Sequence, residues 1–297
     1  MRVLVAGASG FLGTELVARA RAAGHEVVRL VRRPAAAPDE SSWAPDRGDV
    51  DLAELDRADA VVNLSGASLA RLPWTRRYRA EIVASRVAAT RTLVEGMRQA
   101  AAPPAVLLNA SAVGAYGDRP GETLDESAAP GEGFLAEVVA VWEQEALRAP
   151  SGTRTVLLRS GIVVGRGGAM RRMAALTRAG LSARLGSGRQ HWPWIALDDE
   201  IDAMLHLLDS ELDGPVNLVG PAPATADHVL AALATRMHRP YFLAAPAPLI
   251  RLGLGVAADE LLLADQAAVP QRLLDDGFRF SRPSVETALD AMLAVER

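Results

Sequence analysis

Residues 3–13 read Val3-Leu4-Val5-Ala6-Gly7-Ala8-Ser9-Gly10-Phe11-Leu12-Gly13, and a helical pattern follows. A short apolar strand that leads through three glycines at this spacing into a helix is typical of a turn that binds a dinucleotide. Gly7 lets the chain turn sharply, Gly10 removes a side chain where the backbone approaches a pyrophosphate, and Gly13 lets the helix pack close to the sheet. The free N–H groups at the start of the helix face the phosphates. The residues of this turn that we expect to bind a cofactor are Gly7, Ser9, Gly10, Phe11, Leu12 and Gly13.

The end of the next expected strand, residues 26–31, indicates which dinucleotide binds. Proteins that bind NAD usually carry Asp or Glu there, about 20 residues after the glycines, to accept hydrogen bonds from the ribose 2′-hydroxyl. This chain carries Arg32 and Arg33 instead. Two guanidinium groups suit a 2′-phosphate, because its oxygens accept hydrogen bonds from a fork of N–H donors. We therefore predict NADP(H) as the cofactor, with Arg32 and Arg33 binding its 2′-phosphate. The alternative is that both arginines are only solvated in the loop before Pro34.

Composition limits the classes of protein that the chain can belong to. It has 297 residues, of which 49% are hydrophobic, so it can bury a large core as a globular protein. A net charge of −4 gives no electrostatic reason to expect a nucleic acid partner. The absence of cysteine excludes disulfides, thiolate metal sites and thiol nucleophiles. Because the chain has no cysteine, any redox chemistry must come from a cofactor. All 32 residues counted as Lys plus Arg are arginine, so the chain contains no lysine.

The sequence also carries no sign of export, of membrane insertion or of a metal site. The first strand leads directly into the glycine turn, so no signal-peptide pattern is present. Arg251 and the Asp259-Glu260 pair interrupt the most apolar stretch, so no run approaches the roughly 18 apolar residues of a membrane span. The five histidines show no spacing typical of metal ligands. We expect a cytoplasmic protein without a membrane partner or a bound metal.

Apolar runs alternate with amphipathic helical stretches through the first two thirds of the chain, which indicates parallel strands joined by crossover helices. Strands are expected at 2–6, 26–31, 59–64, 105–110 and 154–159, and helices at 11–23, 51–57, 77–100 and 134–149, with a loop at 34–45. The predicted fold is α/β: a Rossmann-type doubly wound parallel sheet in residues 1–165, which residues 194–220 complete. Residues 166–193 and 221–297 are expected to form a smaller, mostly helical C-terminal lobe that covers the substrate.

Further motifs follow one another in a fixed order along the whole chain. They are residues 7–13, 60–67, Ser85-Arg86-Val87, Thr90, residues 111–117, 134–137, Trp142-Glu143, residues 158–165, 186–190 and 194–199, then Gln266, Pro270, Leu273, Gly277-Phe278, Phe280 and Pro283. Each is modest alone, but together they are specific. On these motifs the chain resembles the extended short-chain dehydrogenases and nucleotide-sugar epimerases, and more narrowly their atypical epimerase-like subfamily, which carries a small C-terminal domain.

The resemblance implies an NADP(H)-binding sheet with a substrate cleft at the carboxyl ends of its strands. It adds Leu64, Ser65 and Gly66 to the expected cofactor-binding residues. Classical members use a serine together with Tyr-x-x-x-Lys on one helix face, where the tyrosine acts as acid or base. The matching segment here is Phe134-Leu135-Ala136-Glu137-Val138, and neither its phenylalanine nor its valine has a proton to exchange. We therefore expect that the usual proton relay cannot operate.

Three polar side chains near the missing relay are candidate catalytic residues. Ser111 ends a core strand, where such proteins place a hydroxyl that holds a substrate oxygen, although the match can instead fall on Ala112. Tyr116 can donate a proton if its ring faces the cleft, and otherwise it packs with its hydroxyl bonded. Glu137 lies next to the missing lysine position, and the alternative is a solvated carboxylate on the helix surface.

A later loop supplies candidate substrate-binding residues. Arg189 can clamp an anionic substrate while Trp192 and Trp194 form walls of the cleft. The alternative for Arg189 is a structural ion pair.

Two functions agree with these observations. The first is an NADP(H)-dependent oxidoreductase that transfers hydride between the nicotinamide and a small carbonyl or alcohol. The second is a non-catalytic NADP(H)-binding module that senses the redox state of the cofactor and signals to a regulatory protein partner through the C-terminal lobe. A third function, nucleotide-sugar epimerisation, needs the base of the Tyr-x-x-x-Lys relay, which this chain lacks, so we do not expect it. A homo-oligomer is compatible with either function.

Overall fold

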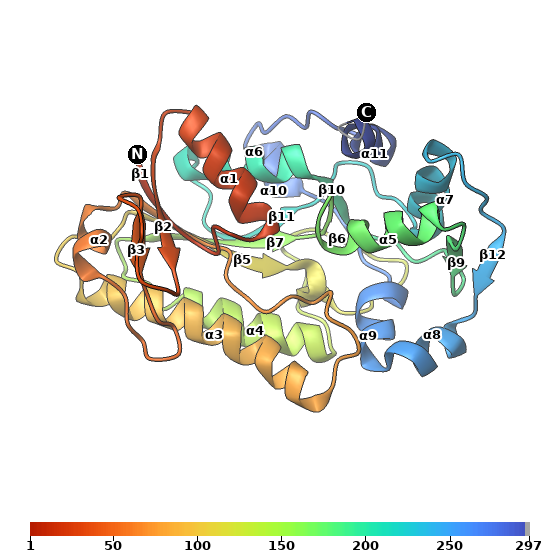
Figure 1. The fold of residues 1–297 in the computed structure, drawn as a ribbon, viewed down its shortest axis with the longest axis horizontal. Helices are drawn as coiled ribbons and strands as arrows, with labels where there is room; N and C mark the ends of the chain where they lie inside the picture. The colour runs from red at the N-terminus through yellow and green to blue at the C-terminus, as the bar shows by residue number, and fades with distance from the viewer. Residues whose placement is uncertain (295–297) are drawn as a thin grey trace.

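The computed structural model, which describes residues 1–294, contains a seven-stranded sheet with helices on both faces and a lobe of shorter elements beside it (Figure 1). The strand order is β11-β7-β5-β4-β1-β2-β3, and every pair is parallel. The strands are β1 (Arg2–Ala6), β2 (Glu26–Val31), β3 (Glu40–Ser42), β4 (Ala60–Asn63), β5 (Val106–Ala112), β7 (Arg154–Ser160) and β11 (Gly214–Leu218). The order reverses between β1 and β4, which is where doubly wound sheets bind ligands. The predicted doubly wound parallel sheet is confirmed.

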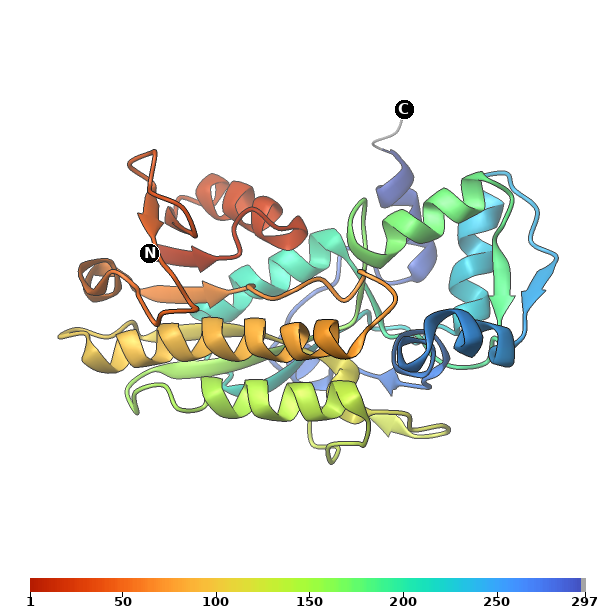
Figure 2. The same cartoon turned by 60° about the horizontal axis from the view of Figure 1, so that its bottom comes forward.

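Helices cover both faces of the sheet. Figure 2 shows α3 and α4 side by side on one face, with α1 and α6 on the opposite face. The bounds are α1 (Phe11–Ala22), α2 (Leu52–Arg57), α3 (Arg76–Gln99), α4 (Phe134–Ala146) and α6 (Leu197–Asp209). Alternate residues of β1 point to opposite faces, so Val3 packs with the core beneath α1 and α6, while Leu4 packs with the core beneath α2 and α3.

The lobe lies beyond the carboxyl ends of the strands and contains short elements (Figure 1). Three two-stranded parallel pairs occur, β10-β8, β12-β9 and β13-β6. The remaining elements are η1 (Val113–Tyr116), β6 (Thr123–Leu124), β8 (Ile162–Val164), α5 (Gly168–Arg178), β9 (Ala183–Leu185), β10 (Trp194–Ala196), α7 (Ala226–Arg236), β12 (Leu243–Ala245), α8 (Ala247–Leu254), α9 (Val256–Ala258), η2 (Asp259–Leu263), β13 (Ala267–Ala268), α10 (Gln271–Asp275) and α11 (Val285–Ala294). Of the helices described, none combines the length and apolar character needed to cross a bilayer.

One expectation about the sheet is wrong. The sequence predicts a loop over residues 34–45, but residues 40–42 form β3 at the edge of the sheet, paired with β2. The three residues Glu-Ser-Ser carry none of the apolar alternation that predicts a strand. The strand forms because the edge of β2 offers unpaired backbone groups. It is also held by ion pairs: Asp39 accepts from Arg21 of α1 and Arg29 of β2, and Glu40 accepts from Arg33 after β2.

Candidate functional site

A cavity of about 960 Å³ lies over the carboxyl ends of β1, β2 and β4, where the strand order reverses. It is lined by residues 7–10, 29–33 and 64–68 together with Glu40, Trp43, Pro45, Asp46, Glu81, Ala84, Ser85, Ala88 and Ala89. The sequence-predicted cofactor residues among them are Gly7, Ser9, Gly10, Arg32, Arg33, Leu64, Ser65 and Gly66. Three segments far apart in sequence therefore meet at one cavity.

The glycine turn brings α1 close to the end of β1. Gly7 has a φ of +80°, a conformation that side chains rarely adopt, and a Cβ there would lie 2.8 Å from the Leu64 carbonyl group. A Cβ on Gly13 would lie 2.2 Å from the Gly7 carbonyl oxygen. These positions admit only glycine, because any side chain would overlap backbone atoms. The turn thus brings backbone, rather than side chains, to the floor of the cavity.

The first turn of α1 is suited to a diphosphate. The N-cap residue is Gly10, and no side chain of the described residues caps the helix. Uncapped N–H groups at a helix N-terminus attract phosphate oxygens. Phe11 and Leu12 do not line the cavity with their side chains, since Leu12 packs against the core and the Phe11 ring lies against Gly165 and Gly167.

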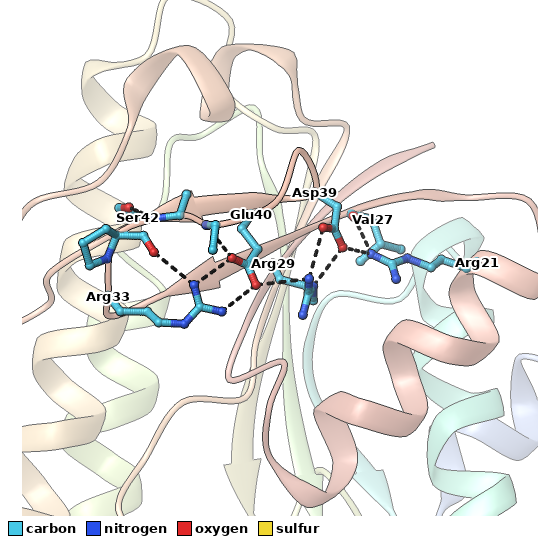
Figure 3. A network of polar contacts seen from close by, with 10 residues as sticks. Arg21, Val27, Arg29, Arg33, Asp39, Glu40 and Ser42 are labelled. Carbon is cyan, nitrogen blue, oxygen red and sulfur yellow. Dashed lines mark hydrogen bonds and ion pairs between the residues drawn. The ribbon is translucent and has the colours of Figure 1, made fainter.

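Arginines and carboxylates alternate at the β2 and β3 end of the cavity (Figure 3). Arg33 donates to both carboxylate oxygens of Glu40, at 2.8 and 2.7 Å. Arg29 contacts Glu40 at 3.1 Å and donates to Asp39, which also accepts from Arg21. The hydrogen bonds from Arg33 lower the pKa of Glu40 to about 2, so this carboxylate is charged at neutral pH.

Arg32 differs from its neighbour. It is exposed and lines the cavity, but no ion pair or side-chain hydrogen bond joins it to another residue of the described chain. Arg33, in contrast, is held by Glu40 and also donates to the Pro34 carbonyl at 3.0 Å. Of the two arginines expected to bind a phosphate, Arg32 is therefore the one available without breaking an existing contact.

Two candidate catalytic residues belong to one buried polar network. The Ser111 hydroxyl donates to the Glu143 carboxylate at 2.6 Å, and Arg159 donates to both oxygens of the same carboxylate at 2.8 Å. Arg159 also donates to the Tyr116 hydroxyl at 3.1 Å. The Glu143 carboxylate raises the pKa of Arg159 despite the opposing effect of burial. The network therefore holds Ser111 and Tyr116 together.

Tyr116 lies inside the protein and not at the cofactor cavity. Its side chain is fully buried, and its hydroxyl donates to the Asn217 side-chain oxygen at 2.7 Å. Burial raises the pKa of this hydroxyl. A hydroxyl with both partners filled and a raised pKa holds its proton tightly, which matches the packing alternative for this tyrosine.

The positions of the missing relay are filled by apolar packing. Val138 is 3% exposed and lies in a cluster with Trp74, Ile82 and Leu135, against which Phe134 packs. The rings of Phe134 and Trp74 meet edge to face, with centroids 5.6 Å apart. These side chains stabilise the contact between α3 and α4.

The C-terminal lobe contacts the N-terminus of α4, beside the positions of the missing relay. The Glu260 carboxylate accepts the backbone N–H groups of Phe134 and Leu135, at 2.7 and 3.0 Å. A residue of η2 thus satisfies the N-terminus of α4. The apolar segment from α8 to η2 is consequently fixed next to the helix that carries the relay in classical members.

The remaining predicted site residues lie apart from one another. Glu137 is exposed on α4, and Arg189 is exposed on its loop. The Trp192 and Trp194 side chains are only 3% and 2% exposed, and each donates its indole N–H to a backbone carbonyl. Both indoles belong to the core beneath α7 and α11, so they support the loop and do not line the cofactor cavity.

Several residues that shape the site have no role predicted from the sequence. Arg86 on α3 is 8% exposed, donates to the Ala67 and Ile82 carbonyls, and lies over the Trp142 ring at 5.0 Å. Burial lowers its pKa to about 10. Ser85 accepts the Ala67 N–H at 2.9 Å and lines the cavity. The signal was the Ser85-Arg86-Val87 motif, whose polar residues lie in an otherwise apolar helical face.

The described residues include no group of three or more His, Asp or Glu side chains that could hold a metal ion.

Comparison with known proteins agrees with this geometry. Residues 3–220 match the family model "NAD dependent epimerase/dehydratase family", and residues 245–292 match a domain of unknown function, DUF1731. An epimerase family protein of Mycobacterium bovis is 41% identical over 290 residues, which cover 97% of this chain and 96% of that protein. The crystal structure of the human epimerase family protein SDR39U1 (isoform2) with NADPH superposes with a TM-score of 0.91 at 32% identity, covering 99% of each chain.

A more distant structure shows the fold alone. Thermus thermophilus UDP-glucose 4-epimerase in complex with NAD has a TM-score of 0.74 at 21% identity, covering 98% of this chain and 99% of that chain. The glycine turn, the doubly wound sheet and the match over residues 3–220 lead to one conclusion. This chain belongs to the NAD dependent epimerase/dehydratase family and carries a C-terminal DUF1731 domain.

Proposed function

We propose that this chain is an NADP(H)-dependent oxidoreductase that acts on a small carbonyl or alcohol. The observation that carries the proposal is the cavity over the glycine turn, whose β2 end presents Arg32 without an acidic partner in residues 1–294. A positively charged group at this position suits a 2′-phosphate, which NAD lacks. The presence of NADPH in the SDR39U1 crystal structure supports the same cofactor here.

The residues of the chain would hold the cofactor at three places. The backbone of residues 7–13 and the N-terminus of α1 would take the pyrophosphate. Arg32 and Arg33 would take the 2′-phosphate, and residues 64–66 would lie beside the cofactor between β4 and α3. When bound, the cofactor supplies the hydride, while the protein supplies alignment.

Proton transfer is the step for which this chain is least equipped. Ser111 donates its hydroxyl proton to Glu143, and Tyr116 donates its proton to Asn217, so neither is free to protonate a substrate without exchanging a partner. Glu137 and Arg189 are exposed, and Arg189 is our candidate for an anionic substrate group. We therefore propose slow turnover on simple carbonyls, in which the Ser111 hydroxyl exchanges Glu143 for the substrate oxygen, gives it a proton and is itself reprotonated by water.

A second candidate function is a non-catalytic NADP(H)-binding module with a regulatory protein partner. It is favoured by the apolar cluster in which Phe134 and Val138 occupy the positions of the proton relay. A helix packed in this way binds no substrate oxygen there. The two functions share the cofactor site and differ only in chemistry.

The test is oxidation of NADPH by a panel of aldehydes and ketones, followed through the cofactor absorbance. An enzyme consumes NADPH with at least one carbonyl, and Ser111→Ala slows the rate. Tyr116→Phe should change the rate no more than Tyr241→Phe does, because the Tyr116 hydroxyl is bonded to Asn217 and the Tyr241 hydroxyl to Asp227 in the lobe. NADPH that binds but is never consumed supports the module, and a protein that binds no NADPH contradicts both functions.

A further inference from the structure

The C-terminal lobe contains a second cavity of about 370 Å³. It lies among α5, β9, β12 and α8, which are grouped at the end of the molecule far from β2 and β3 (Figure 1). Its lining is Met173, Leu176, Leu181, Ser182, Ala183, Leu185, Leu230, Ala245, Leu249, Ile250, Gly253, Leu254 and Leu262. None of these residues lines the cofactor cavity, so the two sites are separate.

The chemistry of this lining excludes charged ligands. It contains no charged side chain, and its apolar residues come from both sides of the cavity. A phosphate or a carboxylate buried there would lose its hydration without gaining a counter-charge. A nucleotide or a sugar phosphate therefore does not fit, whereas a hydrocarbon chain does.

Several apolar side chains of the wall are still in contact with water. Leu176, Leu181 and Leu249 line the cavity and are 47%, 57% and 63% exposed. Exposed apolar surface that surrounds a hollow marks a binding site, because a ligand that covers it removes that surface from water. The volume also lies in the range of about 300–1,000 Å³ that is usual for small-molecule sites.

One polar group in the wall lacks a partner. Ser182 is 4% exposed, and its Oγ is buried without a hydrogen-bond partner among the described residues. A buried hydroxyl left unpaired destabilises a protein by about 1–3 kcal/mol, so such groups are usually satisfied by a ligand or by water. Ser182 therefore provides one hydrogen bond in a lining that is otherwise apolar.

We propose that this cavity, which we call the lobe cavity, binds an uncharged molecule with a hydrocarbon chain and one hydrogen-bonding group, such as a fatty alcohol or a long-chain ketone. The chain covers the leucines of the wall, and the polar group bonds the Ser182 hydroxyl. This inference does not depend on the proposed function, because the two cavities share no residue.

Gly253 allows the lobe cavity to be filled without disturbing the backbone. It lines the cavity on α8, and a Cβ placed on it meets no atom within 4 Å. A side chain at this position therefore enters open space, and replacing a helical glycine also favours the helix. Gly253→Phe should fill the cavity, while Gly253→Ala leaves most of it open. Leu252→Ser is the matched surface control, because Leu252 is 85% exposed and does not line the cavity.

The experiment measures binding of the uncharged apolar dye Nile red to the full chain by fluorescence, and its displacement by 1-dodecanol or dodecanoate. We expect saturable binding that 1-dodecanol displaces better than dodecanoate. Gly253→Phe should weaken probe binding by about tenfold or more, and Gly253→Ala and Leu252→Ser should retain it. Ser182→Ala should weaken the binding of 1-dodecanol by about threefold to tenfold, and it should raise the stability of the free protein.

Three results would overturn the proposal. The first is the absence of saturable binding to the unmodified protein. The second is binding that survives Gly253→Phe but is lost in Leu252→Ser, which would assign the probe to the outer face of α8. The third is preferential displacement by dodecanoate with no effect of Ser182→Ala. If Gly253→Phe fails to fold, Gly253→Leu and Ser182→Ala provide the same comparison.

Discussion

The guanidinium of Arg33 donates two hydrogen bonds to the Glu40 carboxylate, whereas the adjacent Arg32 lines the same cavity without an acidic partner in the described chain. The two arginines are therefore not equivalent, although they are neighbours in sequence. A 2′-phosphate can reach Arg32 directly, but it must compete with Glu40 for Arg33. The sequence predicts that both arginines bind the phosphate, and from these contacts we expect Arg32 to contribute more.

The first prediction concerns this ranking. Arg32→Ala should weaken NADPH binding by about tenfold to a hundredfold, the value of a charge-assisted hydrogen bond or two, and leave NADH binding nearly unchanged. Arg33→Ala should weaken NADPH binding less than Arg32→Ala does, since Glu40 already holds the Arg33 guanidinium. Calorimetric titration with both cofactors measures the difference. Arg47→Ala is the control, because Arg47 is exposed and outside the cavity. A larger loss in Arg33→Ala than in Arg32→Ala would reverse the ranking.

Glu40 provides a second test of the same site. Its carboxylate lines the cavity and remains charged at neutral pH, so it repels a phosphate and holds Arg33 away from it. Glu40→Gln should therefore tighten NADPH binding several-fold relative to NADH. Calorimetric titration with NADPH and NADH measures this change as well. Weaker NADPH binding in this variant would mean that Glu40 positions Arg33 for the phosphate instead of competing with it.

The glycine turn can be tested through stability. Gly13→Ala places a Cβ within 2.2 Å of the Gly7 carbonyl oxygen, so α1 must move away from the turn. We expect a loss of about 1–3 kcal/mol or more in the free energy of unfolding. Gly152→Ala is the control, because a Cβ there meets no atom within 4 Å. Urea unfolding compares the variants. Equal stability of Gly13→Ala and the unmodified chain would show that the turn tolerates a side chain.

Glu200 makes stability depend on pH. Its side chain is fully buried on α6 and accepts the Ser160 hydroxyl at 2.6 Å, and burial raises its pKa to about 8. The folded state therefore binds the proton more tightly than the unfolded state, whose carboxyl titrates near its ordinary value. The free energy of unfolding should fall by up to about 1.4 kcal/mol per pH unit as the pH rises from about 4.5 to 8, and then level off.

Glu200→Gln should remove this fall, because an amide does not titrate. Urea unfolding at several pH values between 5 and 8.5 measures the slope. Glu132→Gln, at an exposed position, should leave the slope unchanged. If both variants keep the slope of the unmodified protein, another group is responsible for it.

The parts of the fold that depend on local chemistry could be predicted from the sequence. The glycine turn requires its residues for reasons of backbone contact, so Gly7 and Gly13 indicated its structure directly. The alternation of apolar strands and helices predicted the parallel sheet. The strand β3 could not be predicted, because its three residues are polar and its pairing depends on the edge of β2.

The orientation of single side chains was harder to predict. Trp192 and Trp194 flank a glycine-rich loop, which favours a cleft wall, but the core beneath α7 takes both indoles. Tyr116 follows a strand end, yet its hydroxyl points to Asn217, a residue about a hundred positions later. Such contacts join distant segments, so no local sequence pattern predicts them.

Titration with the two reduced cofactors tests the central claim most directly. Trp43 lines the cavity, so quenching of tryptophan fluorescence with energy transfer to the dihydronicotinamide reports binding. We predict saturable binding of NADPH that is at least about tenfold tighter than that of NADH, because only NADPH carries the phosphate that Arg32 can bind. Equal affinities for the two cofactors, or no saturable binding of either by the folded protein, would contradict the account.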